Sequence, residues 1–449
     1  MINAIQTKKD RWSAALCNAS ILLYLVWLML PAVQTTGKAI SGVATVCLFA
    51  LGVLLDADTW KKDGLGLLAR ILCIAAMPLI LFFFLGRGGD KFLSFYVQNG
   101  MFFFPLVFCG YARQRGDSRL WRWVKPVLLT VVTLTVLTTI FWLIEGMFFR
   151  GDTVYAYSRS LGTAEPGYEA YLKELMLKNI GGYDFVYAMV AALPLTILGI
   201  QYSKGWKRAA YTALLALQTL MIVLSQYTYA MLYAAVILAV EILAALLRWL
   251  SRGRVKMGLS LVLGLLPLLL VWFLKMPLLR LAQGIFAQAG LDSFAFSLEQ
   301  LMIALEGGVT DENSRLVHYQ QAVQGIRQSP LLGSLLGGEQ WLSRHSDVLD
   351  ALSGVGLLGS AVVCVMLWFM GRGSFRGMGN HPAKAQLCIV WLSVLVTATL
   401  GTVCYSREIM AVAALGTLLV LEGQPSAGDE NTSVGTFVPE TETQPDETE

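Results

Sequence analysis

Charged residues are scarce in this chain, and their scarcity decides which solvent the rest of the sequence is built for. Lys, Arg, Asp and Glu make up 14% of the 449 residues and 56% are hydrophobic, whereas a soluble domain carries roughly 25% charged residues. The net charge is only +4. The basic residues are spread between apolar segments and form no stripe, so nucleic acid is not an expected partner. The composition predicts an all-α polytopic membrane protein.

The cysteine and histidine patterns of disulfide frameworks and metal sites are also missing. The seven cysteines fall in or at the ends of apolar segments without a C-x-x-C pair, and we interpret them as small apolar side chains. His318, His345 and His381 are too far apart for a local H-x-x-x-H motif. No repeat or phosphate-binding glycine loop is apparent. We expect no metal and no cofactor, although a metal site assembled from distant segments stays open.

Long apolar runs are what the chain does have. Segments of about 20 apolar residues can cross the roughly 30 Å hydrocarbon core of a bilayer as helices. Twelve segments fit: 13–33, 39–55, 65–86, 92–112, 126–149, 183–202, 209–224, 228–248, 258–275, 348–370, 386–404 and 409–422. Only Ser225–Tyr229 separates the seventh from the eighth, so eleven spans is the alternative count.

Basic residues predict the orientation of these spans, because Lys and Arg near span ends stay on the cytoplasmic side. Alternate loops are basic when the N-terminus is placed inside, so both termini are predicted to be cytoplasmic. Two long segments, 150–182 and 276–347, are then extracytoplasmic. Residues 1–422 form the predicted membrane domain. Residues 423–449 are acidic and rich in Pro, Thr and Glu, which predicts a disordered cytoplasmic tail.

The longer outer segment contains "TDENSRLVHYQQAVQGIRQSP", which has helical periodicity up to Pro330. Arg315 shares a helix stripe with Tyr319 and other apolar residues, and His318 lies at the edge of that stripe. A partly buried arginine needs an anionic partner. A ligand phosphate held bidentately would serve, and so would a structural salt bridge to Asp184, Glu145 or Glu312.

The order of motifs after Arg315 resembles a known family. The chain reads R-x-x-x-Y at Arg315, P-L-L-G at 330–333, His345-Ser346, and then L-S-G-V-G-L-L-G at 352–359. This resembles the O-antigen ligase and O-antigen polymerase family of bacterial membrane glycosyltransferases. The resemblance covers residues 315–359, and the largest outer segment precedes the tenth span as it does in that family.

The resemblance implies a GT-C-type glycosyltransferase of the bacterial cytoplasmic (inner) membrane with an extracytoplasmic active site. Such an enzyme transfers a glycan from undecaprenyl diphosphate to a hydroxyl of an acceptor glycan without a metal, more often as a polymerase of repeat units than as a ligase. Arg315 would bind the diphosphate, and His345 would be the general base or position the acceptor. Membrane lipid and a chain-length regulator or flippase are further expected partners.

The chain departs from the family pattern at two positions. Ser346 stands where the family commonly has Asn, and Gln226 stands where many members have an arginine between spans seven and eight. The missing positive charge could come from other basic residues of the outer segments. Candidate substrate-binding residues are therefore Arg315, His318, Arg344, Arg327, Arg150, Arg159 and Gln226, with Lys275 as a further possibility.

Alternative functions come from other classes. A catalytically inactive relative fits the loss of the arginine at position 226. A secondary transporter or a flippase for lipid-linked glycans fits twelve spans with both ends inside. Segment 150–182 carries several tyrosines, which suit either a sugar-binding surface or an interfacial amphipathic helix near 168–177.

Overall fold

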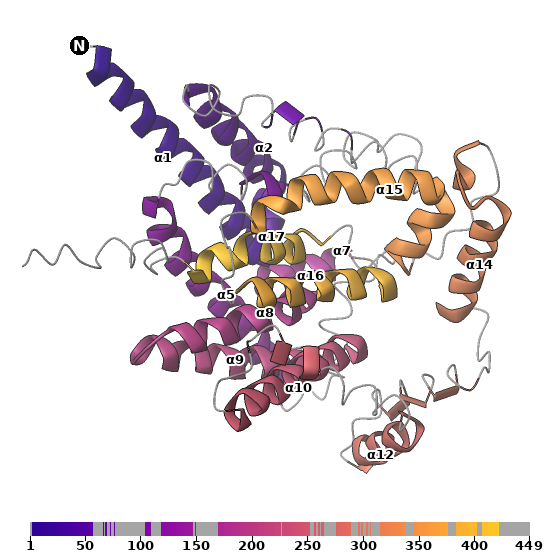
Figure 1. Ribbon diagram of the computed structural model, residues 1–449. Helices are drawn as coiled ribbons and strands as arrows, with labels where there is room; N and C mark the ends of the chain where they lie inside the picture. The colour runs from indigo at the N-terminus through magenta and orange to yellow at the C-terminus, as the bar shows by residue number, and fades with distance from the viewer. Residues whose placement is uncertain are drawn as a thin grey trace, which may run out of the picture.

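The computed structural model describes most of the chain and shows it to be helical. The described residues are 2–56, 104–108, 118–146, 169–225, 227–251, 275–288, 315–336, 345–375, 383–401 and 406–421, with isolated residues between 66 and 76, at 149, and between 256 and 306. Within these residues the regular elements are helices and no strand occurs (Figure 1). The all-α prediction is confirmed for this part of the chain.

Helices of very different length follow one another along the chain. They are α1 (Ile2–Met29), α2 (Pro31–Leu55), α5 (Ser118–Glu145), α7 (Glu169–Leu177), α8 (Tyr183–Tyr202), α9 (Trp206–Leu224), α10 (Thr228–Leu250), α12 (Lys275–Gln288), α14 (Arg315–Gln328), the 3-10 helix η2 (Gly333–Leu336), α15 (Asp347–Phe375), α16 (Ala383–Leu400) and α17 (Arg407–Leu421).

Six of these helices contain segments long and apolar enough to cross a membrane. They are Asp10–Met29, Val124–Glu145, Tyr183–Tyr202, Trp206–Leu224, Tyr229–Leu250 and Asp347–Phe369. Ser41–Leu55 and Ala383–Thr399 are shorter apolar helices, and α17 coincides with the predicted segment 409–422. These helices are compatible with a multi-pass membrane protein. The predicted spans at 65–86, 92–112 and 258–275 lie largely outside the described residues, so the count of twelve stays a prediction.

The first two helices meet more tightly than expected. The sequence predicts a loop between residues 33 and 39, but α1 ends at Met29 and α2 begins at Pro31. Proline has no backbone N–H and its ring clashes with a preceding helical turn, so it ends α1 and suits the first position of α2. Leu30 alone is extended, with φ −113° and ψ 99°. Lys38, expected in the loop, therefore lies within α2.

The break between α9 and α10 is real. α9 ends at Leu224 and α10 begins at Thr228. Ser225 is buried in this link, and its hydroxyl donates to the backbone oxygen of Ile222 over 2.9 Å. The alternative of a single fused span is therefore wrong at this point.

α8 forms the centre of the bundle. It packs against α9, α10, α16 and α17, and most of its residues are buried. Gly199 permits one close contact, because a Cβ there would lie 2.6 Å from a ring carbon of Tyr211 on α9. Large apolar side chains such as Phe141, Ile242 and Val365 are exposed on the outer faces of α5, α10 and α15. A face of this kind suits hydrocarbon better than water.

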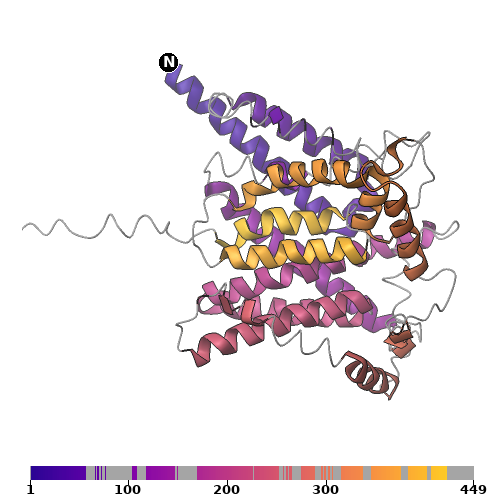
Figure 2. The ribbon, with the colours of Figure 1, turned by 45° about the vertical axis from the view of Figure 1, so that its right-hand side comes forward.

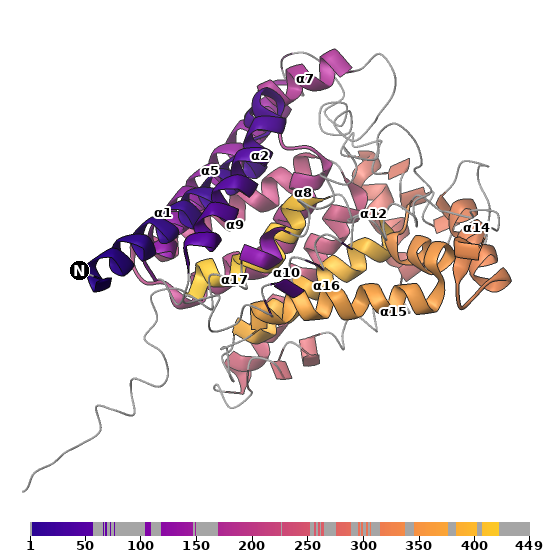
Figure 3. The same cartoon turned by 90° about the horizontal axis from the view of Figure 1, so that it is seen from above.

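The helices of the two predicted outer segments lie at one end of the bundle. α7 belongs to segment 150–182, while α12 and α14 belong to segment 276–347. All three lie at the end opposite the N-terminus (Figures 2 and 3). α7 also corresponds to the amphipathic helix predicted near 168–177. The described helices of the two segments therefore share a side of the molecule, and the assignment of that side to the outside of a membrane stays a prediction.

Candidate functional site

Two glycines bring the separate pieces of the family-like motif into contact. Gly356 interrupts α15 with φ 66° and ψ −174°, and Gly333 at the start of η2 has φ 59°. Both values favour glycine, because a side chain is strained at positive φ. A Cβ on Gly333 would lie 2.6 Å from the backbone oxygen of Gly354, and a Cβ on Gly356 would meet the backbone of Leu331.

Backbone hydrogen bonds then join the P-L-L-G turn to the kink. The N–H of Leu357 donates to the oxygen of Pro330 over 2.9 Å, and the N–H of Leu358 donates to the oxygen of Leu331 over 3.1 Å. The kink frees these donors from the normal helical ladder, and the turn satisfies them. The contact fixes where α14, which ends just before Pro330, sits against α15.

This packing places the two predicted site histidines next to each other. The rings of His318 on α14 and His345 before α15 have centroids 5.2 Å apart and planes inclined by 50°. The hydroxyl of Tyr319 donates to the backbone oxygen of His345 over 3.3 Å. His318 Nδ1 lies 3.3 Å from Oε1 of Gln321. Both histidines are partly exposed, so the pair can be reached from the surface.

The remaining predicted site residues are only partly placed. Arg315 is the first residue of α14, one turn before Tyr319, and its side chain lies outside the described structure. Arg327 is exposed in the last turn of the same helix, about 18 Å from Arg315 at 1.5 Å per residue, so the two do not form one cluster. The other predicted members lie outside the described residues: Arg150, Arg159, Gln226 and Arg344.

One face of α14 borders a surface hollow of about 610 Å³. Its described lining residues are Tyr319, Gln320, Val323, Gln324 and Arg327. Tyr319 therefore contributes to the hollow and also bonds to the segment that carries His345. An aromatic ring with flanking amides and a guanidinium can pack against the C–H face of a sugar and bond its hydroxyls.

An acidic cluster lies where α8, α15 and α17 begin, beside the histidines. Asp184 on α8 interacts electrostatically with Glu408 and Asp347. The positive charge of Arg407 attracts the Asp184 carboxylate electrostatically. The Ser406 hydroxyl donates a hydrogen bond to the same Asp184 carboxylate. Glu408 and Asp347 are only 6% and 7% exposed. Three helix amino termini favour negative charge at this place through their unpaired N–H groups and dipoles.

Further contacts tie this acidic cluster to the rest of the bundle. Gln34 on α2 donates to Oε1 of Glu408 over 2.9 Å, and the backbone N–H of Asp347 donates to the oxygen of Gly401 over 3.2 Å. The Arg407 guanidinium lies 4.9 Å from the ring centroid of Trp27 on α1. His345 precedes Asp347 by two positions, so the histidine pair and the acidic cluster adjoin.

The acidic cluster was not predicted as a unit from the sequence, which offered Asp184 only as a possible salt-bridge partner for Arg315. The available signal was positional: acidic residues occur in the first turns of α8, α15 and α17, and all three spans were predicted to begin on the outer side. Among the described residues no group of three His, Cys, Asp or Glu side chains could hold a metal ion.

Comparisons with known proteins identify no family for this chain. No protein-family model matches the chain, and no curated protein matches it either. The resemblance to the O-antigen ligase and polymerase family therefore depends on the motif residues between 315 and 359 alone.

Proposed function

We propose that this chain is a membrane glycosyltransferase that moves a glycan from undecaprenyl diphosphate to a hydroxyl of an acceptor glycan. The transfer extends a surface polysaccharide. The observation that carries the proposal is the pairing of His318 with His345, 5.2 Å apart between α14 and α15. The family-like motif contains His345, the helix stripe of Arg315 singles out His318, and the two come from segments that the sequence separates. Their place at one end of an apolar bundle suits a donor whose lipid stays in the bilayer.

The reaction assigns one task to each predicted catalytic residue. The acceptor hydroxyl oxygen attacks the anomeric carbon of the donor sugar, and His345 takes the hydroxyl proton as general base. The bond between that carbon and the diphosphate oxygen breaks, and undecaprenyl diphosphate leaves with the electron pair. Arg315 stabilises the departing negative charge through its planar guanidinium. Attack from the face opposite the leaving group inverts the anomeric centre.

The surroundings of the histidines supply the remaining functions. The hollow along α14 offers Tyr319, Gln320 and Arg327 to an acceptor glycan. The start of α15 is anchored next to His345, because the backbone N–H of Asp347 donates to the oxygen of Gly401 and the backbone N–H of Leu349 donates to the hydroxyl of Ser346.

The test uses purified protein in detergent with lipid-linked oligosaccharide from cells that lack this chain. Transfer proceeds in detergent, whereas transport has no meaning there, so activity separates an enzyme from a flippase. His345→Gln should lower the transfer rate about 10²- to 10⁴-fold, the usual contribution of a general base. His381→Gln is the matched control, because the sequence predicts that His381 lies on the opposite side of the membrane.

Arg315 has its own substitution series. Arg315→Lys keeps the charge and loses the planar fork, so it should slow transfer about tenfold to a hundredfold, and Arg315→Ala should slow it further. Wild-type rates in His345→Gln at matched protein level would refute the general-base role. Wild-type rates in Arg315→Ala would reduce the arginine to a structural residue.

A further inference from the structure

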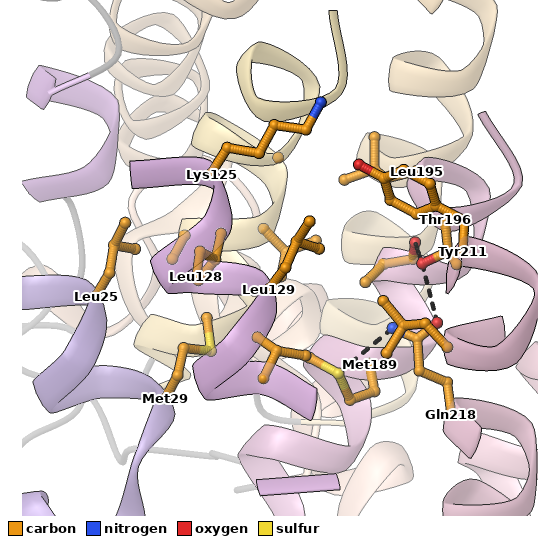
Figure 4. A pocket seen from close by; sticks show the side chains of 16 residues that line it. Leu25, Met29, Lys125, Leu128, Leu129, Met189, Leu195, Thr196, Tyr211 and Gln218 are labelled. Carbon is orange, nitrogen blue, oxygen red and sulfur yellow. Dashed lines mark hydrogen bonds between the residues drawn. The ribbon is translucent and has the colours of Figure 1, made fainter. Parts of the chain in front are cut away.

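A narrow cavity of about 80 Å³ lies inside the bundle, away from the histidines (Figure 4). Residues of α1, α5, α8, α9 and α17 line it. Most of the wall is hydrocarbon, contributed by residues such as Leu25, Leu128, Leu129, Met189 and Leu214. Leu128 and Leu129 are partly exposed, so the cavity borders the outside of the bundle at α5.

Two polar side chains in this wall, Thr196 and Gln218, are bonded to each other. Thr196 donates to Oε1 of Gln218 over 2.9 Å, and Nε2 of Gln218 donates to the sulfur of Met189 over 3.6 Å. Gln218 and Thr196 are 1% and 5% exposed. Because these groups are already paired, a water molecule inside would find too few partners, and an apolar cavity of this kind stays dry or takes hydrocarbon.

A cation stands at one end of the cavity. Lys125 lines it from the first turn of the apolar part of α5, and its ammonium points away from the leucines (Figure 4). From Lys125 to Val132 the α5 wall extends about 10 Å at 1.5 Å per residue. The positive charge of Lys125 at one end of the cavity matches the phosphate of an anionic lipid, and the apolar wall matches its acyl chain.

We propose that this cavity binds one acyl chain of an anionic phospholipid, with the lipid phosphate at Lys125. The hydrocarbon of an acyl chain matches the apolar wall of the cavity. A lysine ammonium is a point charge that suits a phosphate monoanion, and lipids in the adjacent leaflet need no path through the protein. The site is separate from the proposed glycan-transfer site and does not depend on it.

Small residues keep the cavity open. Ala192 lines it and is partly exposed, and Gly416 lines it from α17. Ala192→Phe would fill the space with a ring and exclude an acyl chain. Ala213→Phe is the matched control, because Ala213 is exposed on α9 and the same ring there would face the bilayer. Lys125→Ala removes the cation of the cavity, and Lys207→Ala is its control, because Lys207 is exposed at the start of α9 and does not line the cavity.

The experiment measures where a lipid chain sits. Purified full-length protein is reconstituted into phosphatidylcholine vesicles that contain a minor fraction of phosphatidylglycerol with a photoreactive diazirine on one acyl chain. After irradiation, mass spectrometry locates the labelled residues. The expected labels are on cavity-lining residues of α5, α8 and α9. Ala192→Phe should abolish them, while Ala213→Phe should leave them unchanged.

The headgroup contribution is measured in the same vesicles. Lys125→Ala should lower cavity labelling by phosphatidylglycerol about fivefold, the usual effect of one cation near an anionic lipid. Lys207→Ala, and labelling by a photoreactive phosphatidylcholine, should not show that loss. Cavity labels that survive Ala192→Phe, or that appear only with a photoreactive polyprenyl phosphate, would overturn the proposal. If Ala192→Phe misfolds, loss of anionic preference in Lys125→Ala decides the matter, and unchanged preference refutes it.

Discussion

Asn179 offers a quantitative test of how the bundle is held together at the end that carries the proposed site. It lies in the link between α7 and α8, is 9% exposed, and has a positive φ of 57°. Its Nδ2 donates to the hydroxyls of Thr135 and Thr138, each over 3.1 Å. Its Oδ1 accepts from the backbone N–H of Ala32 over 3.5 Å. One side chain thus joins α5 and the start of α2 to the start of α8.

The cost of removing this side chain can be estimated. Side-chain hydrogen bonds between membrane helices average about 0.6 kcal/mol each, so three bonds contribute about 2 kcal/mol. Asparagine tolerates positive φ better than alanine, which adds about 1 kcal/mol of strain when alanine is forced into that region. Asn179→Ala should therefore lower the free energy of unfolding by about 3 kcal/mol, and Asn179→Gly, which avoids the strain, by about 2 kcal/mol.

Unfolding of purified protein by sodium dodecyl sulfate in mixed micelles, followed by circular dichroism, measures these changes. Lys173→Ala is the control, because Lys173 is exposed on α7 and a surface substitution of this kind usually changes stability by less than about 0.5 kcal/mol. Equal stability of Asn179→Ala and Lys173→Ala would refute the role assigned to the network. Equal loss in the Ala and Gly variants would refute the strain contribution.

Three further predictions concern the site and its orientation. Gly333→Ala and Gly356→Ala should each lower the free energy of unfolding by at least about 2 kcal/mol in the same assay, because both force strain and a backbone clash. Gly284→Ala should not, because Gly284 has open space around it. Ala322, fully buried on α14, should not accept a larger side chain: Ala322→Leu should separate α14 from α15 and lower transfer at least about tenfold, with exposed Gln328→Leu near wild type. Cysteines placed at Ala170 and Gln288 should react with an impermeant thiol reagent in intact cells, and one at Lys207 should not; the reverse pattern would overturn the predicted orientation.

The sequence by itself predicted the helical fold and the apolar segments. Low charge and long apolar runs predict helices that suit a bilayer, because a backbone in a bilayer must satisfy its own hydrogen bonds, and the described residues form apolar helices of that length. Local chemistry also located two further helices: the helical periodicity before Pro330 predicted α14, and the helix near 168–177, one of two alternatives for that segment, corresponds to α7. The tight turn at Pro31 was missed, because an apolar run gives no signal where it breaks unless the proline is read as a helix start.

Only the tertiary structure decided which distant residues meet. His318 and His345 pair because Gly333 and Gly356 let the P-L-L-G turn lie against the kink in α15, and backbone contacts of that kind leave no periodic trace in a sequence. The acidic cluster forms because α8, α15 and α17 begin at the same place, which follows from how helices pack and not from any one segment. The cavity beside Lys125 likewise depends on five helices at once. Packing between helices depends on side-chain shape in three dimensions, whereas hydropathy and periodicity report on each helix alone.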